Sequence, residues 1–228
     1  MRLMRELWEV WRLLISAFLL TLCVSPVSAV VDLKPATSPQ GYVARLLINE
    51  APFPGESGYV SEADTRAAME AILMTLHARS VTLPIPYTRE QVADTNSTNI
   101  LDVITAGGER GQVDGFYRNK SGQLAMVPRI EDRINYLMGI AGQGKPGRFS
   151  RLLDYAITIS NEYFDGELHL TDRFGSLARV GSIAVTGGSY SWMTNRPKFH
   201  PGGYFVKIPN SDDGVLGGNR FFTLKKID

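Results

Sequence analysis

Glu50 is the carboxylate of this sequence whose surroundings best suit acid–base chemistry. It ends an apolar run, and a proline-rich turn, residues 51–56, follows it directly. Pro52 and Pro54 lack backbone N–H groups and disfavour helical angles in the residues before them, so the apolar element must end here. A carboxyl group that leaves such an element beside Phe53 is desolvated, which raises its pKa and makes it a usable general acid. On its own, the same pattern also fits a solvated glutamate at a helix end.

Other common site chemistries lack their signatures. His77, His169 and His200 are far apart in the sequence, and no pair of them has ligand spacing, so we expect neither a metal nor a cofactor. There is no Gly-x-Ser-x-Gly motif, dinucleotide fingerprint or phosphate loop. Carboxylate acid–base chemistry remains, together with aromatic side chains that suit the faces of sugar rings. The aromatic candidates are Tyr117, Tyr190, Trp192 and Phe222.

The first 29 residues have the pattern of an export signal. Arg2, Arg5 and Arg12 precede or border an apolar segment, residues 13–24, and a small-residue cleavage pattern ends at Ala29. The segment is about 12 residues long, whereas a membrane span needs roughly 20. We therefore predict a cleaved signal peptide over 1–29 and a periplasmic or secreted protein, with an uncleaved anchor as the alternative.

The remainder of the chain has the composition of one exported domain. Removal of the signal leaves 199 of the 228 residues, enough for one sizeable core. The signal carries three of the 24 basic and two of the 23 acidic residues, which leaves 21 of each, and a neutral balance argues against a nucleic-acid partner. The single cysteine, Cys23, lies within the signal, so the mature chain has no disulfide. Oligomeric state is left open by these features.

Apolar periodicity and capping residues predict a helix-rich chain. Ser61 is a good N-cap for a long helix that ends near Ser80 and should be the central buried one. Thr88 and Asn99 cap shorter helical turns, and Pro128 suits the first position of a later helix. The predicted helices begin near residues 41, 61, 88, 99, 128 and 149. The first of them, which ends at Glu50, could also form a short strand.

The last third of the sequence changes character from Gly175 onward. Short β-prone pieces are separated there by glycine-rich turns, at 182–185, around 190–192, at 204–208 and at 219–222. The stretch 111–117 is polar, glycine-flanked and aromatic, as in a loop that lines a site. We therefore predict a flexible lead over 30–40 and one mainly α domain over 41–228, of α+β class, whose irregular β region forms one wall of a groove.

Several short motifs follow one another in a suggestive order. Glu50 ends the first apolar element, and a Gly-Glu pair lies at 55–56. An alanine-rich helix then ends in Arg79, and Gln112 follows a Val-Ile pair and a glycine-rich turn. The chain closes on Gly-Gly-Asn-Arg-Phe-Phe, residues 217–222. This order resembles the cell wall hydrolases of the spore-cortex-lytic-enzyme type, over nearly all of the predicted mature chain.

In that family an Ala-Glu-Ala-Arg-Gly-Glu-like stretch carries the catalytic glutamate, a position that Glu50 matches. An Ala/Val-rich helix ending in Asn-Arg, a Val-Ile…Gln-Phe segment and an Ile-Gly-x-His-Arg-Phe-Tyr-like ending follow it. This sequence departs from the pattern by a Pro-Phe-Pro insertion after Glu50, by Ala78 in place of asparagine, by Val113 in place of phenylalanine after Gln112, and by a long insertion before Ala156.

The resemblance implies a lysozyme-like, α-rich fold and cleavage of the β-1,4 bond after N-acetylmuramic acid in peptidoglycan glycan strands. Standard glycosidases use two carboxylates, whereas a lytic transglycosylase can use one, because the muramyl 6-hydroxyl attacks the anomeric carbon and gives a 1,6-anhydro product. Glu50 would protonate the leaving oxygen and then take the hydroxyl proton. The substrate-binding residues that we expect beside it are Glu56, Gln112, Tyr117, Tyr190, Trp192, Asn219 and Phe222.

Two alternatives stay open at this point. The same scaffold could bind glycan or a partner without cutting it, and the Tyr-Trp-rich final third would serve that function equally well. An inverting muramidase would need a second carboxylate facing Glu50, for which Asp114 and Glu109 are the candidates. Glu56 could equally be a solvated loop charge.

Overall fold

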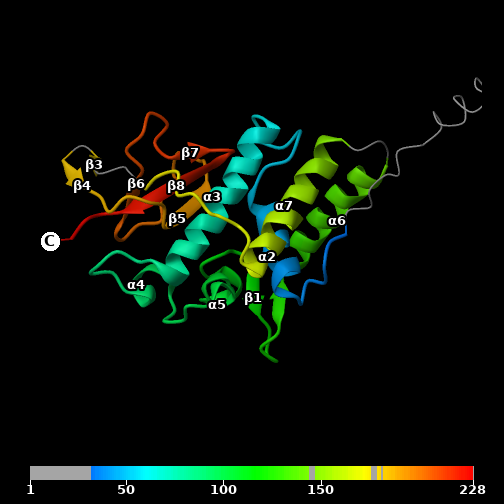
Figure 1. The fold of residues 1–228 in the computed structure, drawn as a ribbon, viewed down its shortest axis with the longest axis horizontal. Coiled ribbons are helices and arrows are strands. Elements are labelled where there is room, and N and C mark those ends of the chain that lie inside the picture. The colour runs from blue at the N-terminus through cyan, green and yellow to red at the C-terminus, as the bar shows by residue number, and fades with distance from the viewer. Residues whose placement is uncertain (1–31, 144–146, 176–178, 181, 228) are drawn as a thin grey trace, which may run out of the picture. The chain divides into compact units, whose positions relative to one another are not determined.

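Helices form most of the first two thirds of the described chain, and short antiparallel strands form the last third (Figure 1). The computed structural model describes residues 32–143, 147–175, 179–180 and 182–227. These residues belong to one compact unit of α+β class, Val31–Asp228. The predicted signal peptide, residues 1–29, and the first two residues of the predicted lead lie outside the described residues. None of the helices in the described ranges has the length and apolar character needed to cross a bilayer.

Helix α2, Pro39–Glu50, presents Glu50 at its last position, and the prediction of a helix here is confirmed. The side chain of Ser38 accepts a hydrogen bond from the N–H of Gly41, and proline fits the first turn because no N–H is needed there. The helix ends where Ala51 takes extended angles ahead of a proline, because a residue in that position avoids helical geometry.

The lead into α2 contacts the rest of the domain in the part that the structure describes, residues 32–38, and its flexibility stays a prediction. Arg45 donates a hydrogen bond of 2.7 Å to the carbonyl of Lys34, and Leu33 and Ala36 pack against the core. The helix also begins at Pro39, two residues inside the predicted lead. Backbone carbonyls can make such contacts even in a segment of polar, proline-containing composition.

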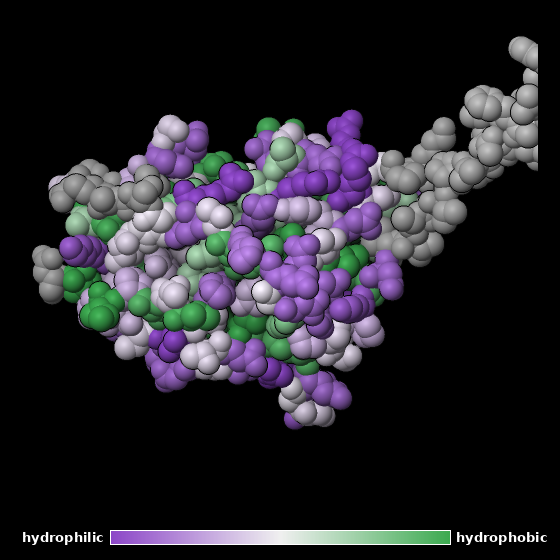
Figure 2. All heavy atoms as spheres, in the orientation of Figure 1, coloured by the Kyte–Doolittle hydropathy of each residue, from purple (hydrophilic) through white to green (hydrophobic). Residues whose placement is uncertain are grey.

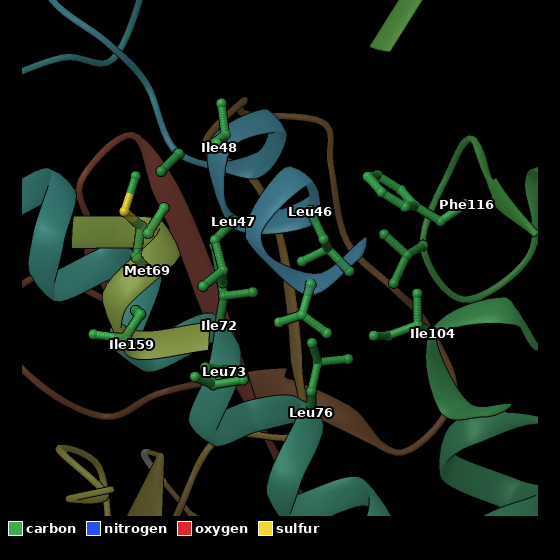
Figure 3. Packing of buried hydrophobic residues seen from close by; sticks show 14 of the residues in the cluster. Leu46, Leu47, Ile48, Met69, Ile72, Leu73, Leu76, Ile104, Phe116 and Ile159 are labelled. Carbon is green, nitrogen blue, oxygen red and sulfur yellow. The ribbon is translucent and has the colours of Figure 1, made fainter. Parts of the chain in front are cut away.

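Helix α3, Glu62–Val81, is the central buried helix, as predicted. Ser61 caps it by accepting from the N–H of Asp64. Its apolar residues face α2 on one side and α7, Arg148–Asp165, on another, and α6, Pro128–Gly142, packs against α2 and α7. In the core, side chains from α2 and α3 interdigitate, notably Leu46, Leu47, Ile72, Leu73 and Leu76 (Figure 3). Burying each of these contributes about 2 kcal/mol.

Two short helices and a hairpin connect α3 to α6. Helix α4, Arg89–Ala93, begins with the capping box predicted at Thr88, and α5, Ile100–Thr105, begins with the predicted Asn99 cap. A 3₁₀ turn, Gly108–Arg110, leads to the antiparallel pair β1, Phe116–Arg118, and β2, Leu124–Met126. This hairpin was not predicted, because the glycines around residues 111–117 point to a loop throughout. Phe116 instead packs edge-on against the ring of Tyr42 in the core.

Strand β8, Asn219–Leu224, organises the C-terminal sheet. It pairs with β5, Ser191–Thr194, with β6, Phe205–Lys207, and with β7, Val215–Leu216, always antiparallel. A separate short pair joins β3, Arg179–Val180, to β4, Ile183–Ala184. The predicted β-prone pieces all contain a strand, and β3 and β7 lie outside those pieces. On the face shown in Figure 2, small groups of hydrophobic residues are scattered among hydrophilic ones. The apolar side chains of β8, Phe221, Phe222 and Leu224, are buried.

Candidate active site

A cavity of about 670 Å³ opens beside the C-terminal end of α2, a size typical of small-ligand sites. Its walls come from the ends of α2 and α3, from α4, the loop 111–114 and the start of α6, and from strands β5 and β6 with the segment between them. The prediction that part of 111–117 lines a site holds for this loop. The lining residues are Asn49, Glu50, Arg79, Gln91, Val92, Gly111, Gln112, Val113, Asp114, Arg129, Ser191, Trp192, Met193, Thr194, Phe199, Pro201 and Phe205.

Glu50 is fixed in this cavity by three hydrogen bonds. Its Oε2 accepts from the indole Nε1–H of Trp192 at 3.0 Å, and its Oε1 accepts from the side-chain amide of Asn49 at 3.0 Å. Its backbone carbonyl accepts from Nδ2 of Asn219 at 2.8 Å. The carboxyl group is therefore oriented from two sides, and the end of α2 is tied directly to strand β8.

The pKa of Glu50 is raised above its ordinary value, and burial is the main cause. Its hydrogen bonds from Trp192 and Asn49 and the positive charge of Arg133 act in the opposite direction, while the negative charge of Asp114 adds to the rise. Because desolvation outweighs the stabilisation of the anion, the protonated form persists to higher pH than in a solvated glutamate. A carboxyl group of this kind can give a proton to a leaving group.

Asp114 is the second carboxylate of the cavity, in a different environment. Its side chain is 70% exposed and pairs with Arg129 at the start of α6. Glu109, the other candidate for a second carboxylate, lines a neighbouring cavity of about 370 Å³ that shares Asp114 and Arg129 with the first. Two carboxyl groups in contrasting environments can divide the acid and base roles of a glycosidase, so Asp114 is the better placed candidate for that mechanism.

Glu56 braces the turn after Glu50 and does not line the cavity. Arg133 of α6 donates to both of its carboxylate oxygens, at 3.0 and 2.6 Å, and the N–H of Phe53 donates to it at 2.6 Å. The same guanidinium donates to the backbone carbonyls of Ile48 and Ala51, on either side of Glu50. Glu56 thus acts on the geometry around Glu50 through Arg133, which differs from both the substrate contact and the solvated charge expected from sequence.

The other predicted site residues divide into two groups. Gln112 and Trp192 line the cavity with Glu50. Asn219 does not line it, and its side-chain amide donates only to the backbone carbonyl of Glu50. The side chains that do not line the cavity are Tyr117 on the β1–β2 hairpin, the mostly buried Tyr190, and the fully buried Phe222, whose ring lies 5.2 Å from that of His200. The sequence prediction gave all four aromatic residues the same sugar-binding role. Along a strand, however, neighbouring side chains point to opposite faces of the sheet, so only some of them can face the cavity.

Arg79, Phe199 and Phe205 line the cavity but were not predicted as site residues. Arg79 is 3% exposed, and its Nε donates to the carbonyl of Tyr190 at 2.5 Å while its Nη1 donates to Oε1 of Gln112 at 3.0 Å. Its guanidinium carbon lies 5.7 Å from the centre of the Trp192 ring. Apolar periodicity predicted Arg79 only as the end of a core helix. The one sequence signal for a site role is that no acidic residue lies one turn away from Arg79 in α3 to pair with it.

No protein-family model, curated protein or solved structure matches this chain. Support for a function therefore comes from the residues of the site and from the order of the sequence motifs.

Proposed function

We propose that the protein is an exported peptidoglycan-cleaving glycosidase, a lytic transglycosylase that cuts the β-1,4 bond between N-acetylmuramic acid and N-acetylglucosamine. The observation that carries the proposal is a desolvated carboxyl group, Glu50, held by Trp192 and Asn49 at the wall of an open cavity. The order of motifs that resembles the cell wall hydrolases, with Glu50 at the catalytic position, supports the same activity. The export pattern of residues 1–29 supports action in the periplasm or outside the cell.

In this reaction Glu50 acts first as acid and then as base. Its proton goes to the glycosidic oxygen as the bond to the anomeric carbon breaks, which leaves Glu50 ionised. The hydrogen bonds from Trp192 and Asn49 then stabilise the carboxylate. The muramyl 6-hydroxyl attacks the anomeric carbon and gives its proton back to Glu50, so the enzyme returns to its starting state. The raised pKa of Glu50 suits the first step, since the acid must be protonated near neutral pH.

The cavity wall supplies the groups that a glycan strand needs. Trp192, Phe199 and Phe205 offer aromatic surface for the faces of sugar rings. The side-chain amides of Gln112 and Gln91 can exchange hydrogen bonds with acetamido groups and hydroxyls. In this proposal these five residues bind the strand while Glu50 acts on the bond between two rings.

Release of soluble fragments from peptidoglycan tests the activity. Residues 30–228 and their Glu50→Gln variant are incubated with purified sacculi, and solubilised fragments and protein bound to the pellet are both measured. We expect fragments from the parent, a loss of at least about 1,000-fold in rate for the variant, and pellet binding by both. Binding by both proteins without release by either would contradict the enzyme and leave a glycan-binding module.

A further inference from the structure

The guanidinium of Arg79 is a buried cation without a counter-charge. It is almost fully buried, and within the described residues no carboxylate lies in ion-pair distance of it. Other arginines near the site, Arg129 and Arg133, each have an acidic partner. Burial lowers the pKa of Arg79 to about 10, because the charged form is poorly solvated there. A buried charge that lacks an opposite charge is costly, and natural proteins rarely retain one without use.

Only part of this guanidinium is hydrogen-bonded to other described residues. The described partners of Arg79 are two neutral acceptors, the carbonyl of Tyr190 and the amide oxygen of Gln112, and they engage Nε and Nη1. No hydrogen bond joins Nη2 of Arg79 to another described residue, and Arg79 lines the cavity. A guanidinium has five N–H donors arranged to meet a carboxylate side-on.

Trp192 lies between this cation and the proposed catalytic acid. Its indole N–H donates to Glu50, while the guanidinium carbon of Arg79 lies 5.7 Å from its ring centre. Glu50 and the cationic Arg79 therefore contact the same indole in the wall of the cavity. Gln112 accepts from Arg79 and fixes the orientation of the guanidinium.

We propose that Arg79 binds a carboxylate of the ligand in this cavity, so that a strand is recognised by its negative charge while Glu50 acts on the glycosidic bond. This inference rests on the proposed function for the ligand class. Peptidoglycan offers two sources of that group: the lactyl carboxylate of muramic acid where the stem has been removed, and the free carboxylates of the stem peptide. Arg79 is thus a specificity-determining residue that sets the preference for strands with a free carboxylate.

Trp192 supplies the signal for a binding test. It is the only tryptophan besides Trp8 and Trp11, so a full chain carrying Trp8→Phe, Trp11→Phe and Glu50→Gln reports on the cavity without cutting the strand. Four probes are titrated: glycan strands stripped of stems, strands that keep their stems, and each after conversion of its carboxylates to methylamides. We expect a change in Trp192 emission and a binding constant about 10- to 100-fold weaker for the methylamide of whichever strand supplies the bound carboxylate.

Two further variants isolate the charge. Arg79→Gln should bind a carboxylate strand and its methylamide equally, whereas Arg79→Lys should keep part of the preference, because it keeps the charge without the fork. The unfolding midpoint of each variant reports whether it folds. If Arg79→Gln does not fold, the comparison of carboxylate and methylamide strands on the chain with Arg79 intact still tests the inference. Equal binding of the carboxylate and methylamide forms by the parent, or no response to any of the four probes, would overturn the inference.

The two proposals can fail separately. If the chain with Glu50 intact releases no fragments but its binding still depends on the carboxylate and on Arg79, the transglycosylase is wrong and the carboxylate site stands on a binding module. If fragments are released at equal rates from carboxylate and methylamide strands, the enzyme stands and the role of Arg79 is wrong.

Discussion

At the scale of single residues, the burial of Glu50 has a cost in stability that depends on pH. Its folded pKa is raised, so between the unfolded and folded pKa values the native state holds more protons than the unfolded state. Stability is therefore lost as pH rises from about 4.5 through the folded pKa, and the loss is complete above it. Each unit of pKa rise corresponds to about 1.4 kcal/mol. The proposed catalytic role of Glu50 would account for a carboxyl group at this cost, as is common at active sites.

Glu50→Gln should accordingly stabilise the protein at pH 7 and have little effect near pH 4. The amide keeps the size of the side chain and an oxygen that can accept from Trp192, but it has no charge to desolvate. Urea denaturation at the two pH values measures the difference. Glu167→Gln, at an exposed position after α7, is the matched control and should change stability at neither pH. A variant less stable than the parent at pH 7 would show that burial does not dominate the pKa of Glu50.

The indole N–H of Trp192 limits how far that pKa rises. Trp192→Phe removes a hydrogen bond that favours the ionised carboxylate, so the pKa of Glu50 should increase further. If Glu50 is the acid, the alkaline limb of the pH profile of kcat/KM should move to higher pH. Phe199→Leu changes another aromatic wall residue of the same cavity, one without a hydrogen bond to Glu50, and should weaken binding with the limb unmoved. An unmoved limb in Trp192→Phe would exclude Glu50 as the group that titrates.

At the scale of elements, α6 positions the end of α2 through one arginine. Arg133 is half-buried and holds Glu56 and two backbone carbonyls around Glu50, so Arg133→Met should destabilise the fold by about 2 to 4 kcal/mol. Arg129, one turn earlier on α6, pairs with Asp114 in solvent, and Arg129→Met should cost less than about 1 kcal/mol. Denaturant unfolding of both variants measures the contrast. Equal costs would mean that the turn after Glu50 does not depend on Arg133.

The β7–β8 turn approaches the turn after α2 so closely that a side chain does not fit. A Cβ on Gly218 would lie 2.9 Å from the carbonyl oxygen of Gly58 and 3.0 Å from Pro52 Cγ, whereas a Cβ on Gly202 would meet nothing within 4 Å. Both glycines have φ of +75°. This close approach brings the next residue, Asn219, to the carbonyl of Glu50.

Gly218→Ala should therefore destabilise the protein more than Gly202→Ala. The shared left-handed backbone costs alanine about 1 kcal/mol at either position. The contacts at Gly218 should add about 1 to 3 kcal/mol and displace Asn219, with a loss of activity. Thermal unfolding and fragment release, measured on both variants, separate the two effects. Equal destabilisation would show that the two turns can move apart at no cost.

At the scale of the whole molecule, the helices could be predicted, and the cavity wall could be predicted only in part. Capping residues such as Ser61, Thr88 and Asn99 act within a few residues of the helix start, so their effect is visible in sequence. The apolar setting of Glu50 could also be predicted, because the apolar residues before it and Phe53 after it are close in the sequence. The bond from Trp192 to Glu50 joins residues 142 positions apart, and it follows from the pairing of β5 with β8, whose register no local pattern fixes.

The same limit explains the misplaced residues. Glu56 has the composition of a loop charge, and only the packing of α6 beside the turn brings Arg133 to it. Trp192 pairs with Phe221, the neighbour of Phe222 on β8, so the side chains of Trp192 and Phe222 point to opposite faces of the sheet. The ring of Phe222 is therefore fully buried, whereas Trp192 lines the cavity. Arg79 was predicted within the core helix, and its place in the cavity wall depends on residues distant in sequence, Gln112 and Tyr190, which accept its hydrogen bonds.

The measurement that tests the central claim most directly is the chemistry of the product in heavy-oxygen water. Sacculi are digested by residues 30–228 in that solvent, and the soluble muropeptides are weighed by mass spectrometry, with Glu50→Gln as the control. A single-carboxylate transglycosylase predicts 1,6-anhydro products, each lighter by one water than its reducing form and free of solvent oxygen, and none from the variant. Reducing products that carry heavy oxygen, and that disappear in Asp114→Asn, would contradict the account and identify a two-carboxylate muramidase.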